Sequence, residues 1–270
     1  MNPLAPIVLV WMVAAGAAAM AQQEYSNLGL QGELSAQPVS EPQSRKVVRA
    51  AASTQRLSNN LPSWRETTVQ YTQQVGSETL LGTGLTRASR FNMDDWQFNG
   101  LYSTKLSPAL RASLDANVSP SHRVLARYAI DGQLHYEFQQ AWLANVGLKT
   151  SSYNDARVNQ LQFGLEHYFS AFSISLGLRP TRAFGRTVYS GEVRGNFYYD
   201  DRNSVGLLLA SGREATPIGA NVALVDVRAV AIIGQHWLNR HWALTYAVNR
   251  TRQGTFYTLR GIDVGIQYAF

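Results

Sequence analysis

The chain has 270 residues, of which 45% are hydrophobic and 16% charged, a composition that excludes a disordered protein and allows one large β domain. It has no cysteine, which excludes structural disulfides, thiolate metal sites, thiol nucleophiles and a lipid-modified cysteine anchor. The net charge of +6 would suit a nucleic-acid ligand, but the basic residues are scattered singly, so we expect no nucleic-acid partner.

The first 45 residues divide into two segments that precede the main domain. Residues 4–20 are almost wholly apolar and end at Ala19-Met20-Ala21, a small-x-small site, which predicts a cleaved signal peptide over 1–21. No Lys or Arg precedes the apolar run, which leaves a membrane anchor as the alternative, although the run is short for a span. Residues 22–45 are rich in Gln, Ser, Glu and Pro without a period, which predicts a disordered periplasmic segment.

From Trp64 onward the chain alternates apolar and polar residues in segments of about ten residues, separated by turn residues, as transmembrane β-strands do. The segment 109–118 shows this alternation best, because every second residue from Leu110 to Val118 is apolar and the residues between them are Arg, Ser, Asp and Asn. The mean hydropathy is slightly negative, and no long apolar run follows the first segment, which excludes a helical membrane protein. The thirteen predicted strands lie near 64–75, 78–88, 95–106, 109–118, 124–138, 141–152, 157–169, 171–182, 187–199, 203–213, 222–237, 241–252 and 257–270.

The connections between these strands alternate between very short and longer polar ones. Barrels place short turns in the periplasm and long loops outside the cell. Aromatic residues flank the short turns and predict a periplasmic girdle, with His167, His236 and His241 as interface residues. The aromatic pairs are Phe138 with Trp142, Phe169 with Phe172, and Trp237 with Trp242, followed by Phe270.

This alternation requires an additional strand. If the short turns are periplasmic, the strand 64–75 begins outside the cell, so a chain released into the periplasm must cross the membrane once before it. The segment Lys46–Leu57 is the only candidate, although its own alternation is weak. We therefore predict an all-β, up-and-down antiparallel transmembrane barrel of fourteen strands over 46–270, with a twelve-strand barrel as the alternative.

The carboxyl-terminal residues 262–270 place Ile, Val and aromatic side chains on one face and polar or small ones on the other. The residues Gly265, Tyr268 and Phe270 resemble the carboxyl-terminal signal of outer-membrane barrels. They predict recognition by the barrel assembly machinery, while an edge strand of a soluble β-sandwich is the alternative.

The central part of the sequence, 119–179, resembles the YaiO family of outer-membrane β-barrels. The similarity extends weakly from about residue 46 to the carboxyl end, although the family's usual Pro is absent before Arg123. It implies the fold and an outer-membrane location, and brings no established catalytic mechanism. The matching motifs are Ser119-Pro120, the strand Arg127 to Tyr136, Gly147 to Tyr153, Asp155, Gly164 to Tyr168, Trp64-Arg-Glu-Thr and Gly82-x-Gly84-x-x-Arg87.

The predicted inward face carries nearly balanced acids and bases. A selective porin would show rings of one sign, whereas mixed charges favour a salt-bridged interior. We therefore expect a non-enzymatic envelope component, with passage of polar solutes or surface polysaccharide as a further possibility. The predicted lumen residues are Arg111, Asp115, Arg127, Asp131, His135, Glu137, Lys149, Glu166, Arg179, Glu192, Arg194, Asp226, Arg228 and Asp263.

The alternative function is an outer-membrane hydrolase or acyltransferase that acts on lipid or peptide at the outer rim. Its candidate groups are Ser121-His122 with Asp155, and His135 between Asp131 and Glu137. Both patterns are unspecific, and neither metal-ligand spacing nor a phosphate-binding glycine loop occurs, so we expect no metal and no cofactor. The expected partners of this predicted monomer are outer-membrane lipid and lipopolysaccharide, besides the assembly machinery.

Overall fold

The computed structural model describes residues 46–270, so the predicted signal peptide and the segment 22–45 lie outside the described residues. The described part contains no helix long and apolar enough to cross a membrane. It forms fourteen strands: β1 (Lys46–Leu57), β2 (Trp64–Val75), β3 (Thr79–Arg90), β4 (Met93–Ser107), β5 (Leu110–Val118), β6 (Tyr128–Gln139), β7 (Trp142–Ser152), β8 (Arg157–Phe169), β9 (Phe172–Ala183), β10 (Arg186–Tyr198), β11 (Ser204–Ile218), β12 (Asn221–Trp237), β13 (Trp242–Gln253) and β14 (Tyr257–Ala269).

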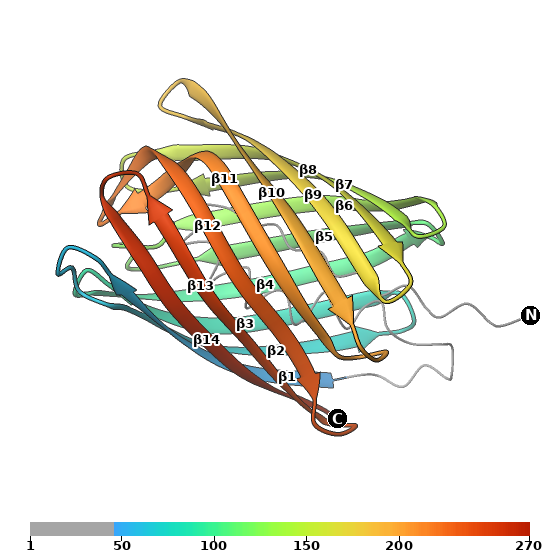
Figure 1. The fold of residues 1–270 in the computed structure, drawn as a ribbon. Helices are drawn as coiled ribbons and strands as arrows, with labels where there is room; N and C mark the ends of the chain where they lie inside the picture. The colour runs from blue at the N-terminus through green and yellow to red at the C-terminus, as the bar shows by residue number, and fades with distance from the viewer. Residues whose placement is uncertain (1–45) are drawn as a thin grey trace, which may run out of the picture.

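The strands form one closed antiparallel barrel (Figure 1). Each strand pairs with its neighbours in the chain, and β1 closes the sheet by pairing with β14, from Val47 opposite Ala269 to Leu57 opposite Leu259. The prediction of Lys46–Leu57 as a strand is therefore confirmed, and the twelve-strand alternative is wrong.

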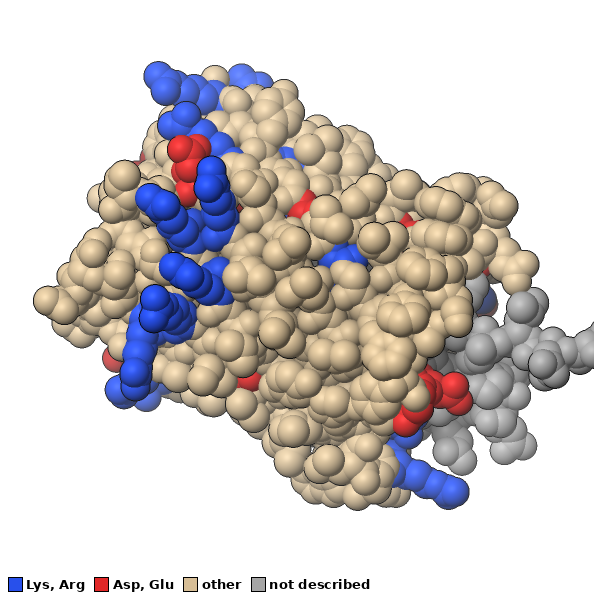
Figure 2. Space-filling view, in the orientation of Figure 1, with Lys and Arg blue, Asp and Glu red and all other residues tan. Residues whose placement is uncertain are grey.

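The outer face of the barrel is apolar. Leu114, Phe163 and Ile266, all predicted to face outward, are 46%, 43% and 45% exposed. Uncharged residues cover most of the wall between the two rims in Figure 2. So much contiguous apolar surface is unfavourable in water, but a bilayer covers it.

Aromatic rings form a belt from β6 to β13 at one end of the barrel. We call this end, where Lys46 and Phe270 lie, the proximal rim, and the opposite end the distal rim. His167 stacks on Trp142 with ring centroids 4.1 Å apart, and His236 stacks on Tyr246 at 5.3 Å. The predicted aromatic pairs Phe138 with Trp142 and Phe169 with Phe172, together with His167 and His236, thus lie in one belt at the same end of the barrel. Successive ring contacts link Phe138, Trp142, His167, Phe169, Phe172, Phe197, Tyr199, His236 and Tyr246.

Several distal connections are shorter than predicted. Three of these connections are only two residues long: 91–92, 184–185 and 219–220. The residues after 213 that were predicted to form a loop instead extend β11 and begin β12. Gly185 and Gly219 have φ angles of +72° and +64°, which glycine adopts without steric cost and which tight hairpin turns require. Residues 119–127 form the longest connection between described strands, because β6 begins later than predicted.

The terminal aromatic residue provides a test of the predicted assembly signal. We expect Phe270→Ala to lower the fraction of the protein that reaches the membrane in folded form, measured by the heat-modifiable mobility of the barrel in gels. Phe138→Ala removes an exposed girdle ring elsewhere on the proximal rim and is the control. Equal losses in both variants would contradict a signal role for Phe270.

Candidate functional site

The barrel interior is the candidate site, because the strands of residues 46–270 direct more acids than bases into it. Alternation with exposed apolar neighbours assigns nine carboxylates and six bases to this inner face. The acids are Glu66, Asp95, Asp115, Asp131, Glu137, Glu166, Glu192, Glu214 and Asp263, and the bases are Arg49, Arg90, Arg111, Lys149, Arg179 and Arg194. The rest of this part of the chain carries seventeen bases and six acids, so the interior has the opposite charge balance to the exterior.

Most of the predicted lumen residues lie where the sequence placed them. Those that face inward are Arg111, Asp115, Asp131, His135, Glu137, Lys149, Glu166, Arg179, Glu192, Arg194 and Asp263.

Three predictions were wrong. Arg127 is exposed in the connection before β6, and Asp226 and Arg228 are exposed on the outer face of β12. Val225 and Val227 occupy the inward positions instead. The apolar run from residue 222 to 225 contains no polar residue that would indicate which face of β12 points into the interior. A shift of the assignment by one residue exchanges the inner and outer faces.

A polar network follows the inner wall from β6 to β9. The Asp131 carboxylate accepts a hydrogen bond of 3.1 Å from Gln162 and lies 3.9 Å from the Lys149 ammonium. Gln162 donates in turn to Gln160, and Gln160 donates to Thr181 at 3.0 Å. These side chains lie along the wall. They link strands that are adjacent or that are separated by one strand.

A glycine makes room for this network. Gly147 on β7 lies between Gln133 and Gln162, and a Cβ atom there would come within 3.0 Å and 3.1 Å of their side chains. Without a side chain at this position, Gln162 on β8 reaches across β7 to Asp131 on β6.

Buried ion pairs also connect neighbouring strands along the wall. Arg179 on β9 and Glu192 on β10 are 2.8 Å apart, and Arg90 on β3 lies 3.1 Å from Glu66 on β2. The Arg90 guanidinium also lies 5.0 Å above the ring of Trp64. Arg90 and Glu66 were not predicted, because each is the one inward-facing charge of its strand and their contact depends on the pairing of β2 with β3.

The opposite wall is different in character. Strands β12 and β13, seven strands away from β5 and β6 in the fourteen-stranded ring, direct no charged side chain of the described chain inward. Asp115 and Asp131 therefore face an uncharged wall across the interior, to which β13 contributes Thr245, Asn249 and Thr251 besides small apolar residues. Its buried residues and those of β11 beside it include Leu208, Val225, Val227, Ala231, Ile233, Ala243 and Ala247.

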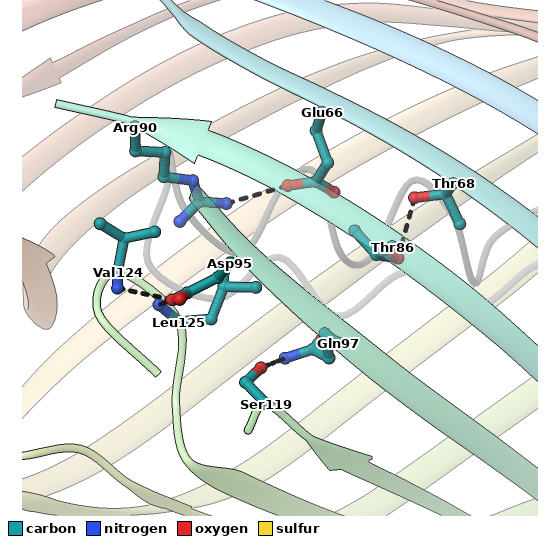
Figure 3. Close-up of polar contacts among 9 residues, drawn as sticks. All are labelled: Glu66, Thr68, Thr86, Arg90, Asp95, Gln97, Ser119, Val124 and Leu125. Carbon is teal, nitrogen blue, oxygen red and sulfur yellow. Dashed lines mark hydrogen bonds and ion pairs between the residues drawn. The ribbon is translucent and has the colours of Figure 1, made fainter. Parts of the chain in front are cut away.

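The connection 119–127 is fastened at the distal mouth (Figure 3). The fully buried Asp95 carboxylate accepts backbone N–H bonds from Arg123, Val124 and Leu125 at 3.0, 2.7 and 2.9 Å. Val124 and Leu125 also pack against Ala88 and Met93 on the inner wall. No local sequence pattern indicates this clamp.

The proposed catalytic groups do not come together. His122 contacts the carbonyl oxygen of Pro120 through Nδ1 at 2.9 Å, and the carboxylate of Asp155 accepts the N–H of Val222. His135 instead lies 3.5 Å from the hydroxyl of Ser113, and this pair was not predicted.

The described residues 46–270 contain no group of His, Asp or Glu side chains that could hold a metal ion.

The family model described as the YaiO membrane beta barrel domain matches residues 45–216. No curated protein sequence matches the chain. Among solved structures, the chain is similar to the CymD monoaromatic hydrocarbon channel, with a TM-score of 0.58 and 10% identity over 95% of this chain and 94% of that one.

Two other solved barrels are also similar. The toluene transporter TodX of Pseudomonas putida gives a TM-score of 0.52 at 10% identity, over 85% of this chain and 90% of that one. The outer membrane protein Omp33 of Acinetobacter baumannii gives 0.51 at 10% identity, over 84% and 99%. At these identities the similarity shows the fold alone.

The clamp predicts that Asp95→Ala releases the connection 119–127. Three hydrogen bonds to a charged acceptor are lost, each worth about 1.5–3 kcal/mol, so the exposed Arg123 and Arg127 should become much faster sites of tryptic cleavage. Asp94→Ala removes the neighbouring exposed carboxylate, which forms an ion pair with the exposed Arg87, and is the control. Equal cleavage of the two variants would contradict the clamp.

The close contact at Gly147 predicts that Gly147→Val destabilises the barrel by about 1–3 kcal/mol, because the added methyl groups displace Gln133 and Gln162. The free energy of unfolding in urea and lipid vesicles measures this change. Gly195→Val on the outer face of β10, where no atom lies within 4 Å of the place that a Cβ atom would take, should leave stability unchanged or higher.

Proposed function

The chain belongs to the YaiO family of membrane β-barrels, and we propose that it acts as a non-enzymatic outer-membrane channel for small polar solutes, with a preference for cations. The observation that carries this proposal is the inner face of the barrel, where nine carboxylates outnumber six bases.

The uncharged inward residues support passage of polar solutes. Amides and hydroxyls both donate and accept hydrogen bonds, so they can replace the hydration of water-soluble molecules. A barrel serving only as a membrane anchor would gain more stability from an apolar interior. Such residues include Gln55, Thr68, Gln70, Thr72, Gln97, Gln133, Asn145, Gln160, Gln162, Asn249 and Gln267.

The positions of the carboxylates support cation preference. Asp115 lies directly opposite Asp131 in the register of β5 and β6, and Lys149 is the base that pairs with Asp131. Asp115 and Glu137 are partly exposed. Uncompensated carboxylates at accessible positions attract cations and repel anions.

Two observations favour a channel over an enzyme. The groups predicted for catalysis at the outer rim are engaged with different partners, and Asp155 bonds to β12. The similar structures CymD and TodX are described as a channel and a transporter, which supports the same class of function.

Planar-bilayer recording of the purified folded protein tests the proposal. We expect the current to rise in steps as single barrels insert. Under a potassium chloride gradient, the reversal potential should have the sign expected when potassium permeates more readily than chloride. Absence of conductance from inserted, folded protein would refute a channel, and anion selectivity would refute the proposed preference.

A double variant tests the contribution of the inner carboxylates. A carboxylate about 4 Å from a passing cation contributes about 1 kcal/mol at a water-like dielectric constant, so Asp115→Asn with Glu137→Gln should lower the cation-to-anion permeability ratio by up to about fivefold. Asp94→Asn with Asp226→Asn removes the same charge from outward-facing positions and should leave the ratio unchanged. An equal effect in both double variants would contradict selection by the lumen.

A further inference from the structure

Arginines gather on the outer wall at the distal rim (Figure 2). Six exposed arginines lie on the five neighbouring strands β11, β12, β13, β14 and β1, with Asp226 as the acid among them. We call this set the arginine patch: Arg56, Arg213, Arg228, Arg250, Arg252 and Arg260.

The pairing of the strands brings these like charges directly opposite one another. Arg260 on β14 is opposite Arg56 on β1 and Arg250 on β13, and Arg228 is opposite Arg252. Side chains directly opposite on adjacent strands are close neighbours, and like charges in such pairs destabilise a sheet. No residue of the arginine patch forms an ion pair within residues 46–270. An external anion would relieve this repulsion.

An apolar surface begins immediately below the arginine patch. Two residues further from the distal rim, β12, β13 and β14 expose Val230, Val248 and Ile262 on the same outer face. The surface therefore changes from cationic to apolar within a few ångströms along each strand. This arrangement fits a ligand that joins an anionic headgroup to hydrocarbon chains, and a soluble anion would leave the apolar part without a partner.

The type of residue indicates which anion is bound. All six bases are arginine, whose planar guanidinium group pairs with phosphate through two parallel hydrogen bonds. Four of the six arginines lie beyond residue 216, so the family match does not include most of the arginine patch. We infer that the arginine patch binds the phosphorylated headgroup of an outer-leaflet glycolipid of the lipid A class, while Val230, Val248 and Ile262 contact its acyl chains.

This site lies on the outer wall and is independent of conduction through the lumen. Binding of bis-phosphorylated lipid A to the purified full-length barrel in detergent micelles, measured by native mass spectrometry, tests it. We expect Arg250→Gln, Arg252→Gln and Arg260→Gln together to weaken binding at least about tenfold, because charge-assisted hydrogen bonds to phosphate are lost.

A matched control removes the same charge at the proximal rim. Lys46→Gln, Lys105→Gln and Arg240→Gln replace three exposed bases there and should leave lipid A affinity unchanged. Lipid A without its phosphates should bind weakly and equally to all three proteins. Equal affinity of the two triple variants, or wild-type affinity for the phosphate-free lipid, would overturn the inference. Heat-modifiable mobility confirms that each variant is folded, and a conductance defect with intact lipid binding would concern the channel proposal alone.

Discussion

Hydrocarbon offers no partner to a backbone N–H or C=O group, and this constraint governs the whole barrel. Each of the fourteen strands bonds on both sides, and the sheet has no edge because β1 pairs with β14 along nearly its full length. The N–H of Phe270 bonds to the carbonyl of Lys46 at 2.9 Å and completes the seam at the proximal rim. A barrel without β1 would leave β2 and β14 with unpaired edges in the membrane.

Closure also determines the chemistry inside. With one face of every strand assigned to lipid, the polar half of each alternating segment must share the interior, where each polar group needs a partner. The chain meets part of this need along the wall, as in the contact from Gln162 across Gly147 to Asp131. Because β12 and β13 contribute no charge, the interior has two chemically different sides.

The sequence predicted the strands well, since alternation is a local property. The topological need for one more crossing identified Lys46–Leu57, whose own pattern is weak. Two kinds of feature were not predictable. The apolar run at the start of β12 fits either face, so Asp226 and Arg228 were assigned inward. The Asp95 clamp joins groups 28 to 30 residues apart, and the local alternation, which places Asp95 inward and Asp94 outward, does not reveal these partners.

The short distal turns affect how the protein meets its surroundings. In the predicted orientation, three distal hairpins end in two-residue turns, and residues 119–127 are held by Asp95. The distal side of the described chain therefore has few long irregular loops. A protease that approaches the cell would find little unstructured polypeptide to cleave.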